Sequence, residues 1–196
     1  MPIANLYAAS LATGSLSTPN NALGAPNGTY TTDGNGTNSW IAGFNLDPLA
    51  DNIRAVGTQT LSFRVRKGSN NGNPSINTVT LFQNGVALTT FAALTGNVTS
   101  TAGQIFNTTF DGSLLSGLNN LVVEINTSGA GGRKSERNGV ELDYIQLAAN
   151  YEEVLGTTIS AWNGSAFVAG VLQRWNGSAW VSASATRWNG SAWVAT

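Results

Sequence analysis

Two carboxylates in the chain have the spacing that acid–base chemistry uses. Glu141 and Asp143 are two residues apart, and side chains at that spacing share a face of a β-strand. Glycosidases use two carboxylates, about 5 Å apart in retaining and about 6.5 to 9.5 Å apart in inverting enzymes. A general acid also needs burial or a neighbour that raises its pKa. A solvated sheet surface explains the pair equally well, so a glycosidase is the weakest function that we consider.

The composition excludes most other catalytic chemistry. The chain contains neither cysteine nor histidine, which rules out Ser-His-Asp and Cys-His catalysis and most zinc and iron sites. Gly131-Gly132 lacks the spacing of a phosphate-binding loop. We therefore expect a protein that is not an enzyme and that holds no cofactor.

Charge and hydropathy restrict the partners. Charged residues make up 10% of the chain and the net charge is −1, so there is no basic surface of the kind that nucleic acid requires. The N-terminus has no basic segment followed by an apolar one, and no run reaches about 18 apolar residues. We expect no nucleic-acid partner, no secretory signal and no membrane association.

The C-terminal part of the chain repeats one motif three times. Trp162, Trp175 and Trp188 each begin the sequence Trp-Asn-Gly-Ser-Ala, at a fixed step of 13 residues. Such a period indicates a small structural unit copied in tandem. A two-residue Asn-Gly turn would pair each Trp with Ser, whereas a four-residue loop would pair it with the aromatic residue that follows the loop. We favour the four-residue loop, because it uses both aromatic residues of every copy: Trp162 with Phe167, Trp175 with Trp180, and Trp188 with Trp193.

These six aromatic side chains form a large apolar surface for a solitary chain. They offer on the order of 1,200 Å² at about 200 Å² each, against roughly 300 to 600 Å² for the largest apolar patch of a typical monomer. A two-stranded hairpin alone is at best marginally stable. We therefore expect a partner to cover them, and the candidates are other copies of the tail, other subunits of a particle, or stacked sugar rings.

Residues 1–150 have the pattern of an all-β protein, because short apolar runs of period two alternate with clusters of turn-forming residues. In the strand 61–66, Leu61, Phe63 and Val65 should be buried and the two arginines exposed. Asn84-Gly85 predicts a hairpin with a type I′ turn. Trp40 and Phe44 share a face and are assigned to the core rather than to a sugar-stacking surface. Further strands are expected over 40–46, 104–110, 121–125 and 140–147.

A basic loop over residues 129–139 concentrates charge in an otherwise neutral chain. A solvated hairpin tip is the simpler interpretation. The functional alternative is an arm that docks on an acidic patch of a neighbouring subunit through Arg133, Lys134 and Arg137.

Three segments carry a resemblance to a known class of fold: Asn-Ala-Leu-Gly-Ala-Pro-Asn-Gly-Thr-Tyr (21–30), the strand through Trp40 and Phe44, and Gly-Val-Glu-Leu-Asp-Tyr-Ile-Gln-Leu (139–147). Together they resemble the jelly-roll, galactose-binding-like sandwiches of carbohydrate-binding modules and of virion proteins of tailed bacteriophages. The resemblance implies that the closing strand lies near the first one. It also implies, in some relatives, a structural calcium near the turn-rich entry. Here Asn27 stands where Asp is usual and only Asp33 is nearby, so we expect no metal.

The tail repeats resemble the aromatic and glycine repeats of minor tail and capsid-associated proteins of tailed phages. The resemblance to choline- and glucan-binding repeats ranks second. We therefore expect an antiparallel jelly-roll-like β-sandwich (1–150), a linker (151–160) and a tail of three aromatic β-hairpins (161–196).

The function expected from these features is a non-enzymatic structural protein of a phage virion: a capsid decoration, a head fibre or a minor tail protein. It would be assembled in the host cytoplasm, lie on the particle surface, contact other virion subunits and self-associate through the repeats, with a trimer as the simplest homo-oligomer. The alternative is a carbohydrate-binding adhesin that recognises host surface glycans.

Overall fold

The computed structural model describes the backbone of residues 2–14, 16–31, 39–70, 72–131, 138–154, 159–162, 165, 167–170, 173–182, 186–188, 191 and 193–195. Beyond residue 154 it describes side chains only for residues 165, 174–181 and 191. The chain divides into two compact units, residues 1–152 and 153–196, and each is treated by itself below.

The first unit is built from antiparallel strands, and the described part contains short 3-10 turns but no α-helix. This confirms the expected all-β class. The strands are β1 (Ile3–Gly14), β2 (Ile41–Leu46), β3 (Ile53–Ala55), β4 (Thr58–Lys67), β5 (Ser75–Gln83), β6 (Val86–Thr90), β7 (Gly96–Asn97), β8 (Gln104–Asp111), β9 (Leu121–Ser128) and β10 (Val140–Glu153). The 3-10 turns are η1 (Pro19–Ala22), η2 (Ala92–Leu94) and η3 (Gly112–Leu114).

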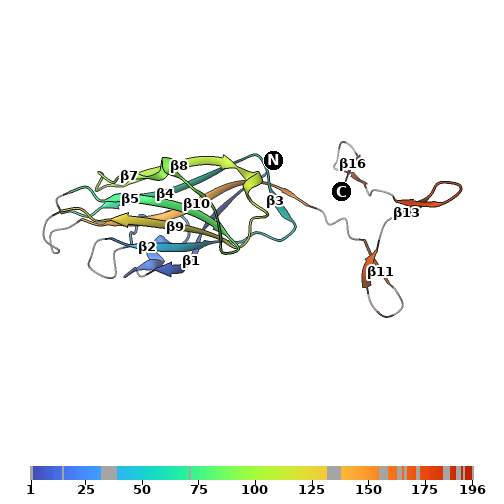
Figure 1. The fold of residues 1–196 in the computed structure, drawn as a ribbon, viewed down its shortest axis with the longest axis horizontal. Helices are drawn as coiled ribbons and strands as arrows, with labels where there is room; N and C mark the ends of the chain where they lie inside the picture. Colours follow the sequence, from blue (N-terminus) through green and yellow to red (C-terminus); the bar gives the residue numbers. More distant parts are fainter. Residues whose placement is uncertain are drawn as a thin grey trace. The chain divides into compact units, whose positions relative to one another are not determined.

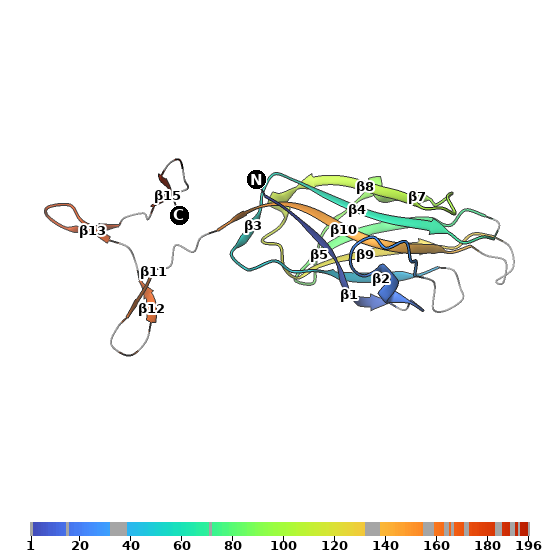
Figure 2. The same cartoon turned by 180° about the vertical axis from the view of Figure 1, so that it is seen from behind.

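Strand β1 belongs to both layers of the sandwich (Figures 1 and 2). Its first half, from Ile3 to Tyr7, pairs with β10, and its second half, from Ala8 to Gly14, pairs with β2. Within the second half, the register against β2 shifts between Ala8 and Ser10 and again between Leu11 and Thr13, and such shifts bend a strand. One layer is therefore β1-β10-β4-β8 and the other is β1-β2-β9-β5-β6. The closing strand lies beside the first one, as the resemblance implied.

The predicted hairpin joins β5 to β6. Asn84 and Gly85 have φ angles of 52° and 78°, and Gln83 pairs with Val86 across a two-residue turn. Positive φ at both central residues defines a type I′ turn, so the prediction is confirmed.

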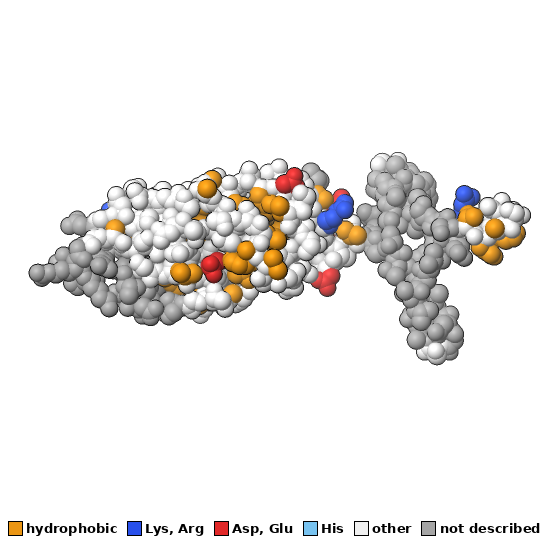
Figure 3. Space-filling model, in the orientation of Figure 1, with side chains coloured by type: hydrophobic (Ala, Val, Ile, Leu, Met, Phe, Trp, Pro, Cys, Tyr) orange, Lys and Arg blue, Asp and Glu red, His pale blue; other side chains and the backbone are white. Residues whose placement is uncertain are grey.

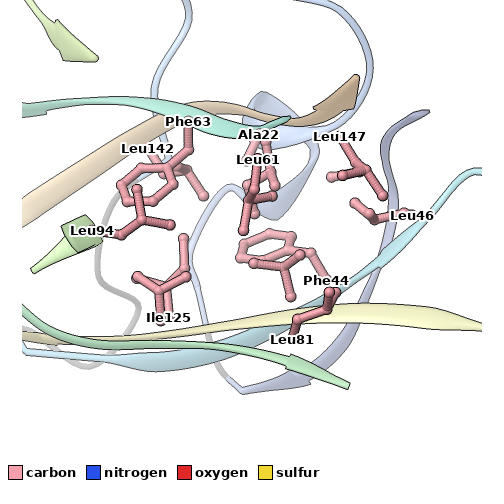
Figure 4. Close-up of a cluster of buried hydrophobic side chains, with 14 of the residues drawn as sticks. Ala22, Phe44, Leu46, Leu61, Phe63, Leu81, Leu94, Ile125, Leu142 and Leu147 are labelled. Carbon is pink, nitrogen blue, oxygen red and sulfur yellow. The ribbon is translucent and has the colours of Figure 1, made fainter. Parts of the chain in front are cut away.

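The core lies between the two layers, where side chains from both sheets point toward one another (Figure 4). Leu61, Phe63 and Val65 are fully buried, as the alternation in β4 predicts. Trp40 and Phe44 are also in the core, and Trp40 Nε1 donates a hydrogen bond to the carbonyl of Val140 at 2.8 Å. Neither is a surface for sugar stacking, in agreement with the expectation.

The second unit contains three two-stranded hairpins with the same aromatic register: β11 (Ile159–Trp162) with β12 (Phe167–Gly170), β13 (Gln173–Trp175) with β14 (Trp180–Ser182), and β15 (Thr186–Trp188) with β16 (Trp193–Ala195). The register places the two aromatic residues of each copy opposite each other. This confirms the four-residue loop. The expected linker is shorter than residues 151–160, because β10 continues to Glu153 and β11 begins at Ile159.

Candidate functional site

The hairpin β13–β14 carries an exposed pair of tryptophans. Trp175 and Trp180 form the last cross-strand pair before the loop, with ring centroids 5.7 Å apart and ring planes at 62°. This edge-to-face arrangement is a preferred geometry for aromatic pairs. The two residues keep 55% and 64% of their surface accessible to solvent, and hydrophobic side chains of this hairpin are visible at the surface in Figure 3. The pair therefore supplies an apolar contact surface that its own unit leaves uncovered.

The loop of this hairpin is held by one side chain. Asn176 Oδ1 accepts hydrogen bonds from the backbone N–H groups of Ser178 and Ala179, both at 2.9 Å, and from Ser178 Oγ at 3.1 Å. Asn176 N donates to the carbonyl of Ala179 at 3.0 Å, and Gly177 has a φ of +103°. The Asn-Gly-Ser-Ala sequence thus closes the loop by an Asx-type turn, which fixes the strands that carry the tryptophans. The repeated Asn was visible in the sequence, but its role as acceptor was not predicted.

The other expected contact residues lie on less fully described parts of the chain. Trp162 and Phe167 face each other in register, as do Trp188 and Trp193, but their side chains lie outside the described set. The basic residues Arg133, Lys134 and Arg137 also lie outside the described residues. Their roles in binding stay predictions.

Asp143 does not lie on a solvated surface, which corrects the interpretation of the pair as part of a solvated sheet surface, whereas Glu141 is only partly buried. The register of β10 against β4 shifts between Leu142 and Tyr144, which places Asp143 at a bulge and buries it completely. Asp143 Oδ1 accepts hydrogen bonds from the N–H groups of Gly28 at 3.1 Å and Asn27 at 3.4 Å. Asp143 therefore fastens the turn-rich entry loop to the closing strand.

Each carboxylate of the pair is bound by an arginine of β4. Arg64 Nη1 lies 3.5 Å from Asp143 Oδ2, and Arg66 Nε donates to Glu141 Oε2 at 2.7 Å. The guanidinium carbons of Arg64 and Arg66 also lie 5.9 and 4.0 Å from the centre of the Tyr30 ring. The two arginines, expected to be exposed, are in fact half-buried in this cluster. Both carboxylates therefore make contacts that link β10 to β4.

The described residues contain no group of three or more acidic, histidine or cysteine side chains that could hold a metal ion. Within the same residues, no helix is long and apolar enough to cross a membrane.

No protein-family model and no curated protein matches this chain. The solved structures that are similar to this chain include three carbohydrate-binding modules with a jelly-roll-like sheet. A family 35 module from Clostridium thermocellum has 14% identity and a TM-score of 0.43, covering 75% of this chain and 98% of that one. The C-terminal family 6 module of a marine laminarinase from Zobellia galactanivorans has 12% identity and a TM-score of 0.42, with coverage of 75% and 99%. A family 35 module from Paenibacillus barcinonensis has 14% identity and a TM-score of 0.42, with coverage of 75% and 99%.

Proposed function

We propose that this protein is a non-catalytic carbohydrate-binding protein whose tail hairpins contact the glycan. The observation that carries the proposal is the Trp175–Trp180 pair, because both indoles are more than half exposed while their loop is fixed by Asn176. An exposed apolar pair held in one geometry is suited to binding, since little conformational freedom is lost when a ligand arrives.

The chemistry of the pair suits a sugar ring. The face of an indole carries partial negative charge, and the C–H groups on the flat face of a pyranose carry partial positive charge. Two indoles at 62° present one face for stacking and one edge beside it. Ser178 in the loop is exposed, and its Oγ, which donates to Asn176 Oδ1, can also accept a hydrogen bond from a sugar hydroxyl.

The size and repetition of the site favour a repetitive ligand. Two tryptophans that are about 60% exposed offer roughly 300 Å² of apolar surface, whereas a standard protein interface covers about 800 Å² on each partner. The same aromatic register recurs in three hairpins. Several small and similar aromatic sites along one chain fit a polymer of small repeated units.

Binding of the full chain to a panel of soluble polysaccharides, measured by affinity electrophoresis, tests the proposal. We expect the variant Trp175→Ala/Trp180→Ala to bind about tenfold more weakly than the unaltered chain. The matched control is Trp40→Phe, which alters a core indole and should leave binding unchanged. Absence of binding across the panel, or binding that the double substitution does not weaken, would overturn the proposal.

A second candidate function is attachment or self-association in a phage virion, at the particle surface. The observation that favours it is the apolar area of the tail, of which the Trp175–Trp180 pair is the described example. Size-exclusion chromatography with light scattering, with and without residues 160–196, separates the two candidates. A stable oligomer that becomes monomeric on truncation supports assembly, and a monomer in both cases supports glycan binding.

A further inference from the structure

The tail carries a charge of one sign. Residues 154–196 contain two basic residues, Arg174 and Arg187, and no acidic residue, although the whole chain is acidic with a net charge of −1. The excess of negative charge therefore lies entirely in the first 153 residues. A positive tail on an acidic protein attracts an anionic partner.

The arginines occupy the same position in two of the three hairpins. Arg174 pairs with Val181 next to the Trp175–Trp180 pair, and Arg187 pairs with Val194 next to the Trp188–Trp193 pair. In the first hairpin this position is Ala161, opposite Val168, and the neighbouring aromatic pair contains Phe167 instead of a second tryptophan. The second and third hairpins are therefore chemically equivalent, and the first lacks both the cation and one indole.

Arg174 is available to a ligand. Its side chain is exposed, and residues 154–196 offer it no carboxylate. A guanidinium matches a carboxylate or sulfate group with two parallel hydrogen bonds. Because Arg174 and Trp175 are adjacent in a strand, their side chains leave opposite faces of a two-stranded ribbon that is open to solvent on both sides. A polymer that stacks one sugar on the indoles and passes the edge of the ribbon can present the acidic group of a neighbouring sugar to the arginine.

We propose that the ligand is an acidic polysaccharide, bound by the second and third hairpins together, while the first hairpin contributes less. This inference rests on the proposed function and adds the charge of the ligand and the ranking of the hairpins. Only residues 183–185 separate β14 from β15, which spans at most about 14 Å. Occupation of one hairpin thus holds the polymer close to the next, and such linkage raises the apparent affinity.

The charge is tested with pairs of polymers that differ only in their acidic group, polygalacturonic acid against its methyl ester and carboxymethyl cellulose against hydroxyethyl cellulose. We expect the acidic member of at least one pair to bind about tenfold more tightly, with the preference shrinking as salt rises from about 20 to about 200 mM. Arg174→Gln/Arg187→Gln should abolish the preference, and Arg174→Lys/Arg187→Lys should retain part of it.

Equal affinity within both pairs, or a preference that survives the glutamine substitutions, overturns this inference. If the polysaccharides still bind and binding depends on Trp175 and Trp180, the proposed function stands without the preference for acidic sugars. If binding does not depend on these tryptophans, the proposed function and this inference both fail. Equally tight binding to poly-glutamate, a polyanion without sugars, also overturns the inference because it would indicate attraction by charge alone.

The ranking is tested with three matched double substitutions. Trp175→Ala/Trp180→Ala and Trp188→Ala/Trp193→Ala should weaken binding to the acidic polymer equally, and Trp162→Ala/Phe167→Ala should weaken it less. An effect at the first hairpin as large as at the other two would refute the ranking.

Discussion

Arg64 Nη1 and Asp143 Oδ2 lie 3.5 Å apart, and the carboxylate of this pair is wholly buried while about a third of the arginine side chain is exposed. The pair is therefore asymmetric. A buried carboxylate that loses its cation has no access to water, whereas an arginine that loses its carboxylate can still be hydrated.

We expect the two single substitutions at this pair to differ in cost. Arg64→Gln should lower the free energy of unfolding by about 3 kcal/mol, because it leaves a buried charge without its partner. Asp143→Asn should cost about 1 kcal/mol, because the amide oxygen can still accept from Gly28 and the freed arginine is hydrated. Urea denaturation of the full chain followed by circular dichroism measures both values.

The double substitution Arg64→Gln/Asp143→Asn is the internal control. It should cost about 1 kcal/mol less than the sum of the two single effects, because both variants remove the same interaction. Strict additivity, or a larger cost for Asp143→Asn than for Arg64→Gln, would contradict the asymmetry.

Close packing at Gly103 gives a second prediction. A Cβ atom at Gly103 would lie 2.5 Å from Arg64 Nε and 2.9 Å from the hydroxyl of Tyr30, and its φ is +121°. Gly103→Ala should therefore displace the arginine and cost about 1 to 3 kcal/mol beyond the backbone strain. Gly24→Ala is the matched control, because Gly24 also has a positive φ, +80°, but has open space around it. An alanine there adds only the backbone strain of a positive φ, about 1 kcal/mol. Equal loss in the two variants, in the same denaturation assay, would show that the contact with Arg64 is unimportant.

The fold was largely predictable because its signals are local. Alternation in β4 identified the buried face, and Asn84-Gly85 identified the turn, since both depend on neighbouring residues alone. Strand β1 was not predicted from the sequence. Its pairing changes from β10 to β2 at residue 8, and buried and exposed residues do not alternate along it.

The cluster around Asp143 was not predicted because it joins residues far apart in the chain. Regular alternation along a strand would place Asp143 on the same face as Glu141. The apolar residues Leu142 and Ile145, however, are both buried although they are three positions apart, and this break in the alternation marks the bulge. The sequence thus contained a signal for the bulge, whereas the contacts with Tyr30 and Arg64 depend on the tertiary structure. In the tail, the pairing of the tryptophans was predictable because each loop is only four residues long.

A third prediction concerns pH. Asp111 Oδ1 accepts a hydrogen bond from the N–H of Ser113 at 2.8 Å, and this bond lowers the pKa of Asp111 in the folded state. A carboxyl group whose pKa is lower in the folded than in the unfolded state stabilises the fold at pH values above its unfolded-state pKa. This contribution is lost as the pH falls through its folded-state pKa. Asp111→Asn should therefore lower the melting temperature slightly at pH 6 and no longer do so near pH 3. A difference that stays constant over this range would show that the carboxylate makes no such contribution.

The last prediction separates the loop of the second hairpin from its aromatic pair. Asn176→Ala removes the oxygen that accepts three hydrogen bonds, so the loop should open and the rings of Trp175 and Trp180 should lose contact. Asn176→Asp keeps an acceptor oxygen in place and should preserve the pair. Nuclear Overhauser effects between the two indole rings in the full chain measure the contact directly, with the stacked rings of Phe63 and Phe106 as an unaltered reference. If the ring contacts in Asn176→Ala are as strong as in Asn176→Asp, the tryptophans hold the hairpin without the loop, and the orientation of the binding surface is set by the aromatic contact itself.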